Sequence, residues 1–188
     1  MKQKGLPVHT NKIANTLKTI GFKSVDNETV SRYLNHICDA FLFYRADRYD
    51  IKGKEYLKTQ NKYYAADTGL CNAAIHYRQI EITHIIENLV YLKLLRRGYI
   101  VDIGKNREKE IDFVAKELGG KKYYIQVSYT IQDEEVKGRE LSAFRLLDDG
   151  YKKILITMDL NPLSNLENGY QMMHLFDFLL NEQALETV

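Results

Sequence analysis

Apolar residues near the start of the chain recur at the spacing of a short helix. In "TNKIANTLKTIG", residues 10–21, Thr10 can cap the first turn and Gly21 can end the helix. Between them, apolar side chains return every three or four residues, which is the period of one helical face. The pattern therefore predicts a short amphipathic helix.

A second helix is predicted in "SVDNETVSRYLNHICDAF", residues 24–41, with Asp26 or Asn27 as its cap. We expect an apolar stripe to be buried: Val30, Tyr33, Leu34, Ile37 and Phe41. The opposite face carries groups that can bond to base edges and phosphates: Glu28, Thr29, Ser31, Arg32, Asn35 and His36.

A hairpin should follow the two helices. "FLFYRADRYDIKGKEYL" breaks from Asp50 to Lys54 around Gly53, and an aromatic run resumes through "TQNKYYAAD". Four lysines would line its surface: Lys52, Lys54, Lys58 and Lys62. Two helices and a basic hairpin form a winged helix, whose second helix enters the major groove while the wing contacts the backbone. Small helical modules also dock proteins, so that alternative stays open.

The pattern changes at residue 82. One long helix, "ITHIIENLVYLKLLRRGY", precedes the strand patterns "YIVDIG", "EIDFVAKE" and "KKYYIQVSY", then a helix, the strand "KKILITMD" and "YQMMHLFDFLL". Short loops make the three strands a meander, and the later helix lets the next strand return in parallel. We predict an α/β fold: a winged-helix-like segment over 1–80, then a mixed sheet flanked by helices over 81–188.

Charge is distributed unevenly along the 188 residues. The net charge is +2, but residues 1–80 hold 13 Lys+Arg against 7 Asp+Glu, and residues 81–188 hold 14 against 18. A basic first part favours contact with phosphate or an acidic partner.

Cysteine use and hydropathy exclude some classes of protein. Cys38 and Cys71 lie far apart without metal-binding spacing, which indicates a reducing, cytoplasmic compartment. A signal peptide and a membrane span are not expected.

Candidate chemistry lies in the second part of the chain. Strand alternation groups Glu110, Asp112 and Val114 on one face, and pairing through the Gly119–Gly120 turn would add Gln126 and Ser128. Glu87 lies among apolar helix neighbours, with no Lys or Arg three or four residues away. Such a carboxylate requires either a metal or a buried donor.

These residues also carry a family resemblance. The run "HIIENLVYLKLLRRGYIVDIGKNREKEIDFVA…YYIQVSY" resembles the C-terminal domain of unknown function that follows the ATPase module in many bacterial and archaeal AAA-type ATPases. That domain is similar in architecture to the PD-(D/E)xK, or restriction-endonuclease-like, fold. "VSRYLNHICDAFLFYRADRYDIKGKEYL…NKYYAADTGLCNAAI" resembles the winged-helix segment that precedes it.

The resemblance implies a metal-dependent nuclease site. Glu87 and Asp112 match the acids that hold Mg²⁺ or Mn²⁺, whereas Gln126 stands where that fold has an acid and Ser128 where it has a lysine. Losing a carboxylate and a cation weakens catalysis. Lys105 or Lys122 is a candidate for the missing lysine.

The leading hypothesis is a DNA-binding module with a weak or inactive nuclease site, working with an ATPase module that is upstream or separate. A P-loop sequence does not occur, so ATP hydrolysis is not expected of this chain. An active Mg²⁺- or Mn²⁺-dependent nuclease and a protein-interaction or homo-oligomerisation module are the alternatives.

Overall fold

A computed structural model describes residues 10–74, 81–160 and 167–186. Its helices are α1 (Thr10–Thr19), α2 (Asn27–Asp39), α3 (Thr68–Ala74), α4 (Ile82–Arg96), α5 (Glu134–Ser142) and α6 (Leu175–Leu180), with short 3₁₀ turns at Phe144–Leu146 and Glu167–Gly169. Its strands are β1 (Phe43–Asp50), β2 (Glu55–Ala65), β3 (Ile100–Asn106), β4 (Lys109–Lys116), β5 (Lys122–Ser128), β6 (Lys152–Thr157) and β7 (Gln171–His174).

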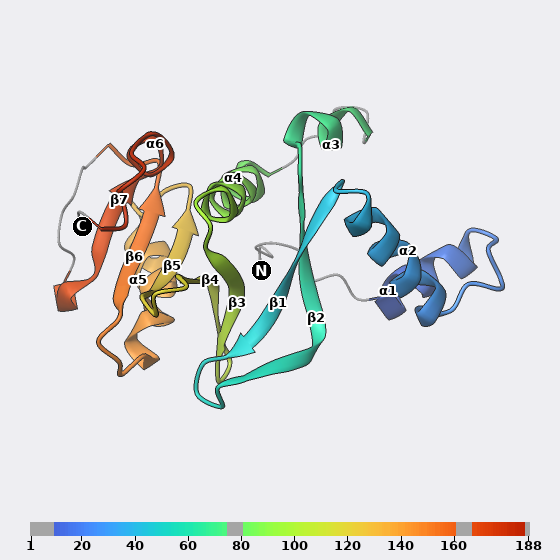
Figure 1. The fold of residues 1–188 in the computed structure, drawn as a ribbon, viewed down its shortest axis with the longest axis horizontal. Helices are drawn as coiled ribbons and strands as arrows, with labels where there is room; N and C mark the ends of the chain where they lie inside the picture. The colour runs from blue at the N-terminus through green and yellow to red at the C-terminus, as the bar shows by residue number, and fades with distance from the viewer. Residues whose placement is uncertain (1–9, 75–80, 161–166, 187–188) are drawn as a thin grey trace.

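The strands form one seven-stranded sheet in the order β2-β1-β3-β4-β5-β6-β7 (Figure 1). β3, β4 and β5 are antiparallel neighbours, and β6 returns parallel to β5 after α5. The α/β class is confirmed, together with the predicted meander and the parallel return. Within the described residues, no helix is both long and apolar enough to cross a bilayer.

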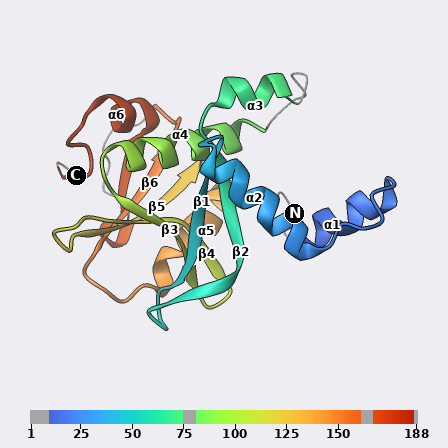
Figure 2. The same ribbon diagram turned by 45° about the vertical axis from the view of Figure 1, so that its right-hand side comes forward.

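Helices cover both faces of this sheet (Figure 1, Figure 2). α4 lies over one face, where its buried residues join a core that includes Phe113, Ile125 and Ile154. α5 and the following 3₁₀ turn cover the other face over a second core that includes Tyr124 and Leu155. The central strands are buried on both faces, which explains their nearly continuous apolar sequences.

The hairpin of β1 and β2 belongs to this same sheet. β1 pairs with β2 antiparallel and with β3 in parallel, in the register Arg48↔Ile103 to Asp50↔Lys105. β1 begins beside α2, and the hairpin turn lies at the opposite end from that helix (Figure 1). The two helices and the hairpin predicted from the sequence are present, but the hairpin also extends the central sheet.

The predicted buried stripe of α2 was wrong at two positions. Asp26 caps the helix as expected, by accepting a hydrogen bond from the Thr29 N–H at 2.8 Å, and Val30 is buried. Tyr33 and Phe41, however, are 63% and 72% exposed. α1 is the main described neighbour of α2, so a single helix contact leaves the rest of the apolar stripe uncovered.

The prediction that Lys62 lines the wing surface was also wrong. Lys62 is only 1% exposed and pairs with Ala46, which belongs to the core beneath α4. The register of β1 and β2 shifts between Ala46 and Arg48, and the bulge changes which β2 side chains face inward. The side chain of Lys58 lies outside the described part of the molecule.

Candidate functional site

Glu87 lies on the buried face of α4 and is bonded to two side chains of β2. Its Oε1 accepts a hydrogen bond from the Tyr64 hydroxyl at 2.7 Å and another from the Lys62 ammonium at 3.1 Å. All three residues are at least 96% buried. The edge strand of the sheet therefore supplies the buried donors that Glu87 lacks on its own helix.

Lys62 also binds a second carboxylate. Its Nζ lies 2.8 Å from Oε1 of Glu110 on β4, and Nη2 of Arg48 donates to the other oxygen of Glu110 at 2.7 Å. Arg48 is 8% exposed. These ion pairs join β1, β2, β4 and α4 in one buried network, which we call the Lys62 cluster: Arg48, Lys62, Tyr64, Glu87, Glu110 and Asp112.

Asp112 reaches this cluster because strict alternation fails in β4. Ile111 and Phe113, which strict alternation would place on one face, instead belong to the two opposite cores. The β3–β4 register shifts between Asp102 and Gly104, opposite this point. Asp112 accepts a hydrogen bond from the Val127 N–H at 2.8 Å, and its charge acts on Lys62 and Glu87.

Gln126 and Ser128 do not join Glu87. Gln126 accepts from the Asp112 N–H at 3.0 Å, but its amide donates to Glu140 of α5 at 3.2 Å, on the other side of the sheet. The Ser128 hydroxyl donates to the Thr130 carbonyl at 3.0 Å. The single polar face predicted for Asp112, Gln126 and Ser128 was therefore wrong, because the bulge separates Asp112 from the other two.

Lys62 occupies the place for which Lys105 and Lys122 were candidates. Within the described chain, the ion pairs of Glu87 and Glu110 are made with Lys62 and Arg48, and Lys105 is not among them. Lys122 pairs with Asp149 at 3.7 Å, on the α5 side of the sheet. The cation comes from the hairpin rather than from β3 or β5.

Burial and charge act on the cluster in opposite directions. Burial by itself would lower the pKa of Lys62, but the nearby carboxylates of Glu87, Asp112 and Glu110 outweigh it and raise that pKa above 10.5. Burial raises the pKa of Glu87, and the contacts with Lys62 and Tyr64 only partly oppose the rise. Lys62 is therefore charged at neutral pH, and two cations face three carboxyl groups.

A hydrated metal ion does not fit this arrangement. Oε2 of Glu87 has no hydrogen-bond partner among the described residues, but Oε1 is already shared by an ammonium and a hydroxyl. Across the described chain, no group of three or more His, Cys, Asp or Glu side chains is placed to hold a metal. Mg²⁺ retains several waters in octahedral geometry, and side chains this deeply buried leave little room for them.

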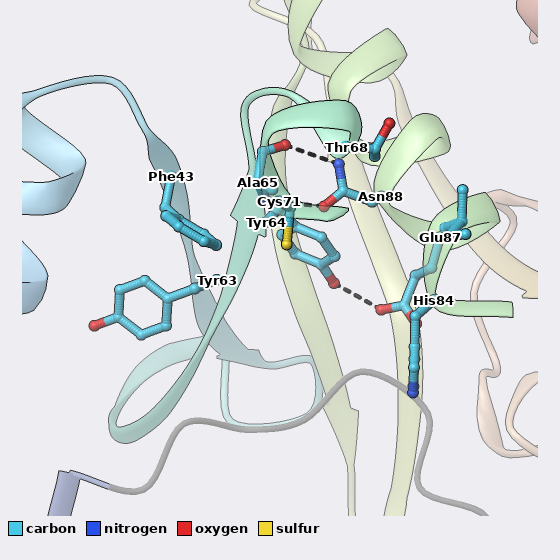
Figure 3. Close-up of a pocket in the computed structure, with 10 residues that line it drawn as sticks. Phe43, Tyr63, Tyr64, Ala65, Thr68, Cys71, His84, Glu87 and Asn88 are labelled. Carbon is cyan, nitrogen blue, oxygen red and sulfur yellow. Dashed lines mark hydrogen bonds between the residues drawn. The ribbon is translucent and has the colours of Figure 1, made fainter. Parts of the chain in front are cut away.

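A pocket of about 260 Å³ lies beside Glu87, between β2, α3 and α4 (Figure 3). Phe43, Tyr63 and Ile85 make much of its wall apolar, and the lining residues include Glu87 but no lysine or arginine. Figure 3 shows Tyr64 and Glu87 pointing toward each other, and the Asn88 amide bonded to the backbone of Ala65. The lining has a carboxylate and His84 but no permanently charged cation, which disfavours entry of a phosphate.

The hairpin turn presents two lysines in a fixed backbone. The Asp50 carboxylate accepts hydrogen bonds from the N–H groups of Lys52 at 3.0 Å and Gly53 at 3.1 Å. Lys54 has φ 54°, a left-handed conformation that the tight turn requires. Lys52 and Lys54 are both exposed, between Asp50 and the exposed Glu55, so the wing tip is an ordered projection with two lysines and two acids.

The predicted contact residues on α2 are also exposed. Arg32, Asn35 and His36 lie on its outer face. The same helix carries exposed acids near its two ends, Glu28 and Asp39, the second of which lies 4.0 Å from His36. The outer face of α2 can form hydrogen bonds, and the wing tip presents its two lysines on a fixed turn.

Comparison with known proteins gives a family match for the first part of the chain. Residues 1–81 match the family described as "Domain of unknown function (DUF8612)". No solved structure matches the chain.

Two relatives match along nearly the full length of the chain. An "Uncharacterized protein" of Haemophilus influenzae is 40% identical over 176 residues, which cover 94% of this chain and 42% of the relative. "Uncharacterized protein MJ1544" of Methanocaldococcus jannaschii is 32% identical over 185 residues, covering 96% of this chain and 39% of the relative. The chain thus spans about two fifths of the length of these relatives.

Sequence analysis missed most members of the Lys62 cluster. Arg48, Tyr64 and Glu110 were not considered as site residues, and Lys62 was placed on the surface. One signal was available: Glu87 needed a buried donor, and Lys62 and Tyr64 alternate correctly to face one side of a strand. The bulge that turns this side inward has no comparable sequence signal.

Proposed function

We propose that this chain is a nucleic-acid-binding module. In this proposal a structural ion network, the Lys62 cluster, stands where a nuclease would have its active site. The observation that carries the proposal is the ordered wing tip, where Asp50 fixes the turn that exposes Lys52 and Lys54. Lysines on a rigid hairpin contact phosphates without a large loss of chain entropy.

The outer face of α2 supplies a second part of the interface. Arg32 and His36 are donors when charged, and Asn35 can both donate and accept, so this face can bond to phosphates or base edges. The acids at the two ends of α2 limit its electrostatic attraction to DNA. At the wing the Asp50 carboxylate is occupied by the N–H groups of Lys52 and Gly53, so we assign most of the salt-dependent affinity to the two wing lysines.

The Lys62 cluster argues for binding rather than cleavage. Its ammonium balances Glu87 and Glu110, as a divalent cation balances carboxylates in a nuclease, and its side chain is 2% exposed. The pocket beside Glu87 has an apolar wall and no lysine or arginine, which disfavours a scissile phosphate there. The cluster instead joins the hairpin to α4 and β4.

One observation favours a second candidate, an active nuclease with a rearranged motif. The structure brings a lysine, Lys62, together with Glu87 and Asp112, which are residue types used by metal-dependent nucleases. Mg²⁺ or Mn²⁺ is the cofactor of that candidate.

An associated ATPase module is part of the proposal. The two relatives are each more than twice as long as the matched region, which leaves room for another module. A wing that binds DNA would place such a module on its substrate.

The test measures binding and cleavage in the same samples. Labelled duplex DNA is mixed with wild type, Asp112→Asn, Lys52→Ala/Lys54→Ala or the control Lys121→Ala, each with EDTA, Mg²⁺ or Mn²⁺. Anisotropy gives affinity, a denaturing gel gives cleavage, and circular dichroism checks folding. Lys121 is an exposed lysine of the β4–β5 turn, distant in sequence from the wing.

We expect wild type, Asp112→Asn and Lys121→Ala to bind equally without cutting, and the wing variant to bind at least tenfold more weakly at low salt. Metal-dependent cutting that disappears in Asp112→Asn would establish the nuclease instead. Absence of binding by folded wild type at low salt would reject a nucleic-acid function.

A further inference from the structure

Tyrosines and lysines form a continuous band on the face of the sheet opposite the Lys62 cluster. The Tyr–Lys band consists of Tyr49, Lys54, Tyr56, Lys116, Lys122 and Tyr151. The band begins at the wing tip, because the turn that presents Lys54 joins the strands that carry Tyr49 and Tyr56. None of these residues has a role in the ion network.

Strand register places the band on one side of the sheet. Tyr49 lies opposite Tyr56, and Lys116 lies opposite Lys122; directly opposed residues share a face. Tyr151 immediately precedes β6. Five strand intervals separate β2 from β6 in the sheet order, so the band crosses about 24 Å at the usual strand spacing.

The lysines of the band lie over aromatic rings. Lys116 Nζ is 3.8 Å from the ring centroid of Tyr49 and 5.4 Å from that of Tyr56. Lys122 Nζ is 4.1 Å from the centroid of Tyr151. These cation–π contacts hold ammonium groups beside phenol rings in an order that alternates along the band.

Part of the aromatic surface is open to a ligand. Tyr56 and Tyr151, near the two ends of the band, are 55% and 42% exposed. Lys54 is exposed, and the side chains of Lys116 and Lys122 are 24% and 18% exposed. An incoming chain can therefore reach both ring surface and ammonium groups.

The acids near the band pair with Lys116 more fully than with Lys122, because burial would lower the pKa of Lys116 but the Asp102 carboxylate raises it. Asp102 lies 2.8 Å from Lys116, and Asp149 lies 3.7 Å from Lys122. Burial lowers the pKa of Lys122, Asp149 raises it, and the charges of Lys116 and Lys54 lower it further, so the net shift is downward from 10.5. The charges of Lys116 and Lys54 thus act on Lys122, and a bound anion would relieve that repulsion.

We propose that the Tyr–Lys band binds single-stranded nucleic acid, with bases stacking on Tyr56 and Tyr151 and phosphates contacting Lys54, Lys116 and Lys122. Every base has a flat ring that stacks on an aromatic side chain, and a basic groove that follows the backbone adds sequence-independent affinity. A duplex keeps its bases stacked on one another, so the rings favour a single strand. The inference rests on the proposed nucleic-acid function. It adds single-stranded nucleic acid, bound by the band, to the duplex DNA that the wing would bind.

The test compares a fluorescein-labelled oligonucleotide of about 16 thymidines, a length at the upper end of common binding sites, with a duplex of equal length. Tyr56→Leu/Tyr151→Leu removes the rings but keeps apolar side chains, and Tyr56→Phe/Tyr151→Phe keeps the rings. Lys122→Ala is matched by Lys121→Ala, because Lys121 is an exposed lysine of the preceding turn that lies 4.0 Å from Glu186.

We expect the Leu variant to bind the single strand about tenfold or more weakly, while the Phe variant stays within about twofold of wild type. Lys122→Ala should weaken single-strand binding, and Lys121→Ala should not. Duplex affinity should change little in the Tyr variants, because the wing makes that contact.

Equal single-strand affinity in wild type and the folded Leu variant, with duplex binding present, would reject the band and leave the proposed function intact. The band proposal would also be rejected if poly-glutamate bound as tightly as the oligonucleotide and the Leu variant bound it equally well. That result would indicate a surface for an acidic protein. If folded wild type binds neither strand form, the proposed function fails first.

Discussion

The position of one lysine decides how the buried polar residues are interpreted. Lys62 Nζ lies 3.1 Å from the fully buried Glu87 and 2.8 Å from Glu110, whose side chain is 32% exposed. A carboxylate as buried as Glu87 cannot remain ionised without a cation, and Lys62 supplies it from β2. If Lys62 lay on the wing surface, as the sequence predicted, a metal would be the natural partner of Glu87.

We predict that Lys62→Met will be strongly destabilising. The change leaves Glu87 buried without its cation, which should lower the free energy of unfolding by about 3 kcal/mol; Glu110 is partly exposed and keeps its pair with Arg48. The double variant Lys62→Met/Glu87→Gln should recover a substantial part of that loss. Urea unfolding of the three proteins measures both effects, and a single-variant cost below about 1 kcal/mol would contradict a structural role.

The cost of Lys62→Met also has a defined pH dependence. A pKa raised in the folded state gives stability that is fully present below the unfolded value of 10.5 and is lost only as pH rises through the higher folded value. The difference in unfolding free energy between wild type and Lys62→Met should therefore not fall on the lysine's account between neutral pH and pH 10.5. A fall well below pH 10.5, traced to Lys62, would show that its pKa is not raised.

The sequence identified Glu87 and Asp112 as chemically unusual, and the structure brings both near Lys62. Glu87 was identifiable because its helix offers no partner, which is a local property. The partner itself depends on a bulge and on pairing between β1 and β2, and those are tertiary features that single-residue periodicity does not encode.

At the scale of elements, sequence patterns predicted the helices and strands better than their packing. Helical and strand periods identified α1, α2, α4 and β3 to β6 because each has a long, regular apolar pattern. The joining of the hairpin to β3 was not foreseen. A winged helix closes its own small core, whereas here β1 pairs in parallel with β3 through only three register pairs.

Alanine substitutions at two glycines, one in β3 and one in α5, test how closely these elements pack against their neighbours. A Cβ on Gly104 of β3 would lie 2.8 Å from the Val114 side chain and 3.0 Å from that of Ile51, so Gly104→Ala should cost about 1–3 kcal/mol. Gly138 within α5 has nothing within 4 Å of that position, and Gly138→Ala should stabilise by about 0.5–1 kcal/mol. Urea unfolding should show opposite signs, and equal effects would contradict the packing of β1 against β3 and β4.

At the scale of the whole molecule, the sheet has two chemically different faces. The face beneath α4 holds the closed Lys62 cluster, whereas the opposite face carries the Tyr–Lys band next to the wing tip. The uneven charge of the chain is consistent with this arrangement, because the basic first part supplies both the wing and the buried Lys62. The groups that we propose to bind nucleic acid face outward, and the ion network around Lys62 faces inward.

The measurement that tests the central claim most directly is the salt dependence of duplex binding. Affinity is measured from about 50 mM to about 200 mM salt for wild type, Lys52→Ala/Lys54→Ala and Lys121→Ala. We predict a steep decline for wild type and Lys121→Ala, and a slope of log affinity against log salt that is smaller by about 2 for the wing variant, about 1 for each lost phosphate contact. Equal slopes for all three proteins, with binding intact, would contradict the assignment of the wing as the main phosphate contact.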